Sequence, residues 1–274
     1  MFPSLEQIAV AAYHRWERRG HAHGRDADDW CAAEQDLLFA LNYEVVAHFD
    51  GATPASVGDP DRRVCRFCEQ GTSQVAFADA PPALPDGLQM PQLVAFDQCG
   101  ECREHFQQAI DLELDLALDR VRSGAPGLSL AGFKGLTRAA LAILPTADLE
   151  SFGDAIEWVS NPDHDLDAGA FNGLGGFVHR SEGSGRWAAI ARRSDAGAPM
   201  PRFLAFFGLG DHVLAFALPL NVLDDERDGE ASIVPRVASP FGTDRQPPES
   251  TWTYLPAATG RPATLRPAES TRPG

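Results

Sequence analysis

Two short stretches decide the fold of the middle of this chain, Cys65-Arg66-Phe67-Cys68 and Cys99-Gly100-Glu101-Cys102. A CxxC turn points both sulfurs at one spot, and two such turns can supply the four thiolates of a tetrahedral Zn²⁺ site with Zn–S distances of about 2.3 Å. Two disulfides are the alternative, which a reducing cytosol disfavours, and a redox CxxC would leave the second pair without a role. We therefore predict a structural Zn²⁺ bound by Cys65, Cys68, Cys99 and Cys102, with no coordination position left for chemistry.

The residues around these cysteines resemble the HNH endonuclease family, a zinc-stapled ββα-metal fold of the treble-clef type. The resemblance spans roughly residues 63–122 and lies in the paired CxxC knuckles, the Leu-Pro-acid step within APPALPDGLQMPQL, and Phe106 with Ile110 on the closing helix. Active members carry a general-base histidine shortly before that proline and an asparagine or histidine after the second CxxC. These positions correspond here to Pro82 and Arg103.

Neither replacement can perform the family's chemistry, because proline has no side-chain base and a permanently charged arginine opposes a divalent ion. The resemblance therefore implies a zinc scaffold whose nuclease site has been lost. His105 follows the second knuckle and is the one histidine on the predicted closing helix, at about 103–122. It is a candidate catalytic residue for the alternative of an active nuclease.

Hydrophobic periodicity organises the rest of the chain. Apolar residues at three- and four-residue spacing predict a helix over 5–18 and a second from about 26 to His48. Further helices are expected over about 130–144 and 148–160. The predicted units are a helical hairpin (1–50), a linker (51–63), the zinc-binding HNH-like unit (64–125), an α+β C-terminal domain (126–240) and a disordered tail (241–274).

Short β-type runs follow these helices at 175–180, 186–193, 200–209 and 212–220, and their spacing suits an antiparallel meander. Gly210-Asp211 is placed as a tight hairpin connection between the last two runs. The predicted fold class is α+β, with an N-terminal helical hairpin, a treble-clef-like zinc unit, and C-terminal helices packed on a small antiparallel sheet.

The N-terminal hairpin resembles a short bacterial domain of unknown function. The matching residues are AYHRWERRG at 12–20 and DWCAAE at 29–34, separated by a loop of Gly, His and Asp. This resemblance implies no activity.

A second polar cluster, Asp163, His164, Asp165 and Asp167, has the residue types of a metal or acid/base site. A turn between helix and sheet explains the same residues, since Asx residues around a proline favour turns. The competing functional hypothesis is an active metal-dependent endonuclease, or another hydrolase, that uses His105 or this cluster.

Charge bears on the choice of partner. The chain has 39 acidic and 23 basic residues, a formal net charge of -16, and no predicted unit within 1–240 has a basic excess. Such a surface repels a phosphate backbone. Nucleic-acid binding is thus implied by the resemblance alone, and a protein partner fits better. No apolar run is long enough to cross a membrane, so we expect a cytoplasmic, non-catalytic binding or scaffold protein.

Overall fold

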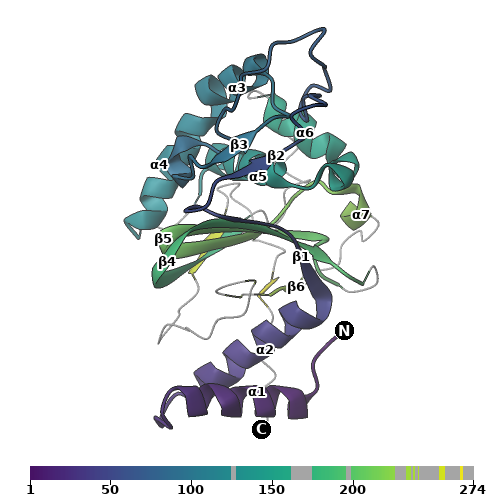
Figure 1. Ribbon diagram of the computed structural model, residues 1–274. Coiled ribbons are helices and arrows are strands. Elements are labelled where there is room, and N and C mark those ends of the chain that lie inside the picture. The colour runs from purple at the N-terminus through teal and green to yellow at the C-terminus, as the bar shows by residue number, and fades with distance from the viewer. Residues whose placement is uncertain are drawn as a thin grey trace.

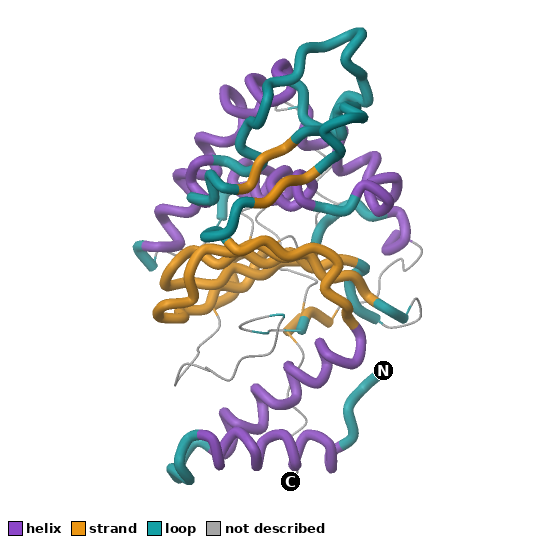
Figure 2. Tube along the Cα trace, viewed as in Figure 1, coloured by secondary structure: helices purple, strands orange, loops and turns teal. Residues whose placement is uncertain are grey.

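The computed structural model describes residues 1–124, 128–161, 175–195, 199–225, 233–235, 237, 240, 253–256 and 266–267. A sheet crosses the middle of the molecule (Figure 1). Most of the helices and a small pair of strands cover one face of it, and two N-terminal helices lie beyond the other (Figure 2). The α+β class is confirmed. No described helix is long and apolar enough to pass through a membrane.

The N-terminal hairpin consists of α1 (Leu5–Arg18) and α2 (Asp26–Asn42). Ser4 and Gln7 form a capping box at the start of α1, where the Ser4 hydroxyl accepts from the Gln7 amide at 3.2 Å. The second helix ends at Asn42, so the prediction that it continues to His48 was wrong. Residues 43–50 are rich in β-branched and aromatic side chains and form β1 (Tyr43–Asp50), which pairs with β4.

The cysteine-bearing region contains β2 (Ala55–Val57) and β3 (Leu93–Ala95), which pair in parallel, and a 3₁₀ turn, η1 (Asp86–Leu88). Its closing helix is continuous but changes pitch, running through α3 (Gly100–Phe106), a π-helical turn η2 (Gln107–Asp111) and α4 (Leu112–Arg122). The predicted helix is confirmed, beginning three residues earlier than expected. Six apolar side chains of this helix are buried: Phe106, Ile110, Leu114, Ala117, Leu118 and Val121.

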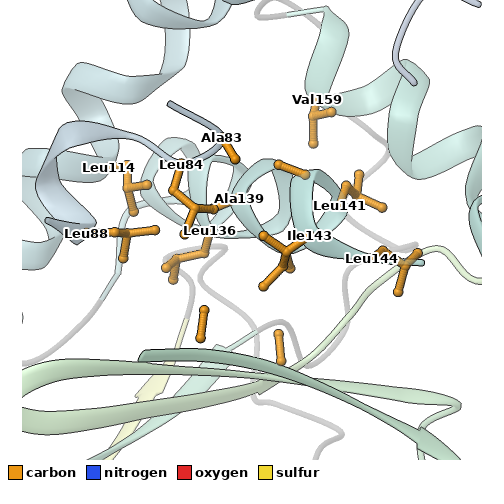
Figure 3. Packing of buried hydrophobic residues seen from close by; sticks show 14 of the residues in the cluster. Ala83, Leu84, Leu88, Leu114, Leu136, Ala139, Leu141, Ile143, Leu144 and Val159 are labelled. Atoms are coloured by element: carbon orange, nitrogen blue, oxygen red, sulfur yellow. The ribbon is translucent and has the colours of Figure 1, made fainter. Parts of the chain in front are cut away.

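The next helices are α5 (Leu130–Ile143), the 3₁₀ segment η3 (Thr146–Phe152) and α6 (Gly153–Ser160). Ser129 caps α5, with its hydroxyl accepting from the Gly132 amide at 3.0 Å. Residues 132–143 of α5 are all buried, including Lys134 and Arg138. A helix buried on every side lies between two layers, and Figure 3 shows α5 above the sheet and beside residues of the cysteine-bearing region.

The central sheet is built from β1, β4 (Gly175–Arg193), β5 (Phe203–Ala217) and β7 (Thr253–Pro256). β4 pairs antiparallel with β5 over most of its length, with β1 through 187–193, and with β7 through 175–178. The strand β7 lies within the segment 241–274 that was predicted from the sequence to be a tail, and it pairs with β4. The remaining elements are α7 (Val222–Asp225) and the short parallel pair β6 (Ile233–Val234) and β8 (Arg266–Pro267).

β5 turns back on itself at Gly210 and Asp211. The amide of Leu218 donates to the carbonyl of Phe203, at the opposite end of the strand, at 3.1 Å. A straight strand would separate these residues by about 50 Å. Gly210 has a φ of 91°, which suits the first central position of a two-residue hairpin turn. The predicted connection at Gly210-Asp211 is therefore confirmed, and β5 consists of two arms, 203–209 and 212–217.

The two faces of the sheet belong to different hydrophobic clusters. One cluster extends from Val57 to Leu218 and joins the cysteine-bearing region, α4, α5 and α6 to one face. The other joins α2 to the opposite face, where the Phe39 ring meets Phe206 with centroids 5.7 Å apart. Figure 3 shows the first cluster around α5, with these residues labelled: Ala83, Leu84, Leu88, Leu114, Leu136, Ala139, Leu141, Ile143, Leu144 and Val159. The division into separate units stays a prediction.

Candidate metal centre

The first CxxC lies at the tip of a small hairpin. Val64 and Gly71 form an antiparallel bridge, and the amide of Cys65 donates to the carbonyl of Gln70 at 2.9 Å. Glu69 adopts a left-handed conformation with a φ of 58°, and its amide donates back to the Cys65 carbonyl at 2.8 Å. This tight turn places Cys65 and Cys68 on one side of the loop.

The second CxxC forms the first turn of α3. Cys99 is the N-cap residue, and its sulfur accepts from the Cys102 amide at 3.4 Å. The Cys99 amide in turn donates to the sulfur of Cys65 at 3.5 Å. Amide donors and the positive end of a helix both favour thiolates, which are the protonation state that binds a metal.

The four sulfur atoms converge from residues that are up to 37 positions apart in the chain. All four lie within 4.8 Å of one another, and Cys68 Sγ is 3.8 Å from Cys99 Sγ. In a tetrahedron with Zn–S bonds of about 2.3 Å the sulfurs are separated by roughly 3.8 Å, so the spacing fits a Zn²⁺ ion. Cys65 and Cys99 are fully buried, whereas Cys68 and Cys102 are partly exposed.

The sulfurs also influence each other's ionisation. A hydrogen bond from the Cys102 side chain, with further bonds from backbone amides, lowers the pKa of the Cys65 thiol to about 4. Burial raises the pKa of Cys99 to about 11, and the charge on Cys65 contributes to that rise. The hydrogen bond to Cys65 raises the pKa of Cys102 as well. Four thiolates at this spacing therefore require a cation among them, which is the condition a metal ion satisfies.

Arg66, between the first two cysteines, connects the knuckle to α5. Its guanidinium donates to the carbonyl of Leu141 at 2.6 Å and to that of Leu144 at 3.1 Å, at the C-terminal end of α5. It also forms an ion pair with Asp97, and both side chains are more than 90% buried. The carbonyl groups of Leu141 and Leu144, at the end of this helix, thus accept hydrogen bonds from Arg66 of the CxxC turn.

Aromatic and cationic side chains pack behind the second knuckle. The Phe67 ring meets Phe106 of α3 edge to face, with centroids 4.7 Å apart. The Phe106 ring also contacts α5, because the guanidinium carbon of the buried Arg138 lies 5.0 Å from its centroid. These contacts join both knuckles to the same buried layer.

The remaining predicted site residues are not part of this cluster. His105 is on α3, and its Nε2 lies 2.8 Å from the carbonyl of Ser160 at the end of α6. Pro82 forms a bridge with Val94 and is exposed. Among the described residues the metal-ligating group contains four cysteines and no histidine. The Asp163, His164, Asp165 and Asp167 cluster lies outside the described residues.

Comparison with known proteins identifies the N-terminal segment only. A family model described as a protein of unknown function, DUF2934, matches residues 4–38. These residues cover α1 and most of α2, so the resemblance of the hairpin to a domain of unknown function is confirmed. The chain matches no curated protein and no solved structure.

Proposed function

We propose that the protein is a non-catalytic, zinc-stabilised binding or scaffold protein, in which a degenerate HNH-like, treble-clef unit joins the other parts of the fold. The observation that carries this proposal is the convergence of four cysteine sulfurs, with Cys68 and Cys99 at tetrahedral spacing. Four sulfurs complete the preferred coordination of Zn²⁺, so such an ion holds structure together and has no position for substrate or water.

The contacts around the cluster support a role in joining the fold. Arg66 extends from the first knuckle to the carbonyls of α5, and Phe106 packs between Phe67 and Arg138. α5 in turn rests on the sheet. The free energy of binding a structural zinc contributes to folding. Through these contacts a zinc ion bound by the knuckles would also stabilise the packing of α5.

The side chains at the family's active positions support the loss of catalysis. Pro82 offers no base, and Arg103 would oppose a catalytic cation. The Nε2 of His105 lies at hydrogen-bond distance from the Ser160 carbonyl. A carbonyl oxygen only accepts, so Nε2 carries the hydrogen in this contact and cannot accept a proton as a base. We propose a protein as the partner, because the net charge of -16 opposes binding to bulk DNA.

Two experiments test this function. After zinc removal by a chelator, hydrogen exchange should accelerate in the amides of residues 141–144 of α5 as well as in the knuckles. Acceleration confined to 64–71 and 98–103 would contradict the joining role.

Supercoiled plasmid incubated with the protein and Mg²⁺ or Mn²⁺ should remain intact. Nicking that disappears in His105→Ala would replace the scaffold proposal by the nuclease alternative.

A further inference from the structure

Four basic side chains gather at the end of the central sheet near the β5 turn. They are Arg122, the last residue of α4, together with Arg180, Arg186 and His212 from β4 and β5. We call this group the basic cluster. Figure 1 shows the C-terminal end of α4 above this end of the sheet. The group is notable in a chain whose formal net charge is -16.

The strand register brings the three sheet residues together. Arg180 lies opposite His212, and Gly185, next to Arg186, lies opposite Gly210. The guanidinium carbon of Arg186 is 3.5 Å from the point that a Cβ on Gly210 would occupy. The turn therefore brings Arg180, Arg186 and His212 to the same end of the sheet.

These residues also face the same side of the sheet. Alternate residues of a strand share a face. Ala188 and Leu214 pack into the cluster beneath the helices, so Arg186 and His212, two positions away along their strands, point to the same layer as α4. Val178, which packs there as well, places Arg180 on that face.

The charges of the basic cluster act on one another. Burial lowers the pKa of His212, and the positive charges of Arg180 and Arg122 lower it further, whereas Asp211 opposes them. Burial and the charge of Arg122 likewise oppose the charge on Arg186, again with Asp211 acting the other way. Like charges at this proximity favour the binding of an anion.

Hydrogen-bond donors in the basic cluster have unused capacity. Nη1 of Arg186 and Nε of Arg122 are buried, and neither has a hydrogen-bond partner among the described residues. Arg122 also forms an ion pair with Asp119 at 3.0 Å and donates to the Gly87 carbonyl at 2.5 Å, which leaves its Nε as the donor available to a ligand. A buried donor without a partner is costly, and a bound oxyanion removes that cost.

We propose that the basic cluster is a binding site for the phosphate group of a small molecule. Guanidinium groups match the geometry of phosphate oxygens, and several converging arginines suit its double negative charge. Arg180 is exposed and His212, Arg186 and Arg122 are partly exposed, so a ligand can reach the basic cluster from solvent. The site lies on the sheet and α4 and does not use the cysteines.

The test is a titration of the full-length, zinc-loaded protein with inorganic phosphate, followed by NMR of the His212 imidazole. Chloride at matched ionic strength is the salt control. Phosphate should shift the His212 resonance saturably and raise its pKa, because the anion stabilises the imidazolium. Arg186→Gln and Arg180→Gln should each weaken binding about tenfold or more, since each removes a charge-assisted contact.

Arg120→Gln is the matched control, because Arg120 is exposed on α4 two residues before Arg122. It should bind phosphate like the wild type. If Arg186→Gln fails to fold, the exposed Arg180→Gln decides the question alone. No saturable shift in the wild type, an equal response to chloride, or unaltered binding by Arg180→Gln would overturn the proposal. Binding of a single-stranded oligonucleotide without binding of inorganic phosphate would overturn it too.

Discussion

Replacing the buried Arg66 by methionine should strongly destabilise the zinc-loaded protein. The change removes the donors to Leu141 and Leu144 and leaves Asp97 as a buried charge without its cation. Removing one partner of a buried ion pair costs about 3–5 kcal/mol. Because domains unfold with about 5–15 kcal/mol, this is a large fraction of the total.

A double-mutant cycle separates the ion pair from the helix contacts. We expect Arg66→Met to lower the free energy of unfolding by about 4 kcal/mol. Adding Asp97→Asn should restore about 1–2 kcal/mol of that loss, because it removes the isolated carboxylate but not the unpaired carbonyls of α5. The assay is urea unfolding at fixed free Zn²⁺, with the zinc content of each sample measured in parallel.

Arg62→Met provides the matched control, since Arg62 is exposed just before the hairpin that holds Arg66. It should change stability by no more than about 0.5 kcal/mol. If Arg66→Met binds zinc fully and is as stable as Arg62→Met, then the knuckle is not coupled to α5 through this residue and the joining role is wrong.

Three further changes have defined outcomes. Phe106→Ala, which removes a fully buried ring between the knuckle and α5, should lower the free energy of unfolding by about 3–5 kcal/mol in urea melts. Burial lowers the pKa of His179 from 6.5 to about 4, so the unfolded state takes up a proton first as the pH falls. The free energy of unfolding should therefore fall by up to about 3 kcal/mol between pH 6.5 and pH 4. In His179→Gln, urea melts across this range should no longer show that pH dependence. Gly210→Ala should lower the melting temperature because the φ of 91° disfavours a side chain, whereas an unchanged melting temperature would contradict the turn assigned there.

The spacing of the cysteines was enough to predict the centre of the candidate site. CxxC turns constrain their own sulfurs locally, so the sequence predicts four candidate ligands without knowledge of the rest of the fold. The buried pair of Arg66 and Asp97 could not be found in this way. Its partners are 31 positions apart, and an arginine inside a CxxC pattern carries no signal of what it contacts.

Helix boundaries were predictable where caps and breakers define them, as with Ser129 before α5. The end of α2 was not. The apolar pattern continues through Val45, and only pairing with the 187–193 part of β4, more than 130 positions away, makes residues 43–50 a strand. Tertiary contacts override local periodicity in such a segment. β7 likewise pairs with β4, a distant partner that its four residues do not identify by themselves.

The zinc content of the purified chain tests the proposed metal centre most directly. Elemental analysis of the wild type should find one zinc per chain, and Cys31→Ser, which changes the cysteine outside the cluster, should retain it. Cys99→Ser should lose the metal and melt at a markedly lower temperature. Equal zinc in Cys99→Ser and the wild type, or no zinc in the wild type under reducing conditions, would contradict a structural zinc site formed by the four cysteines.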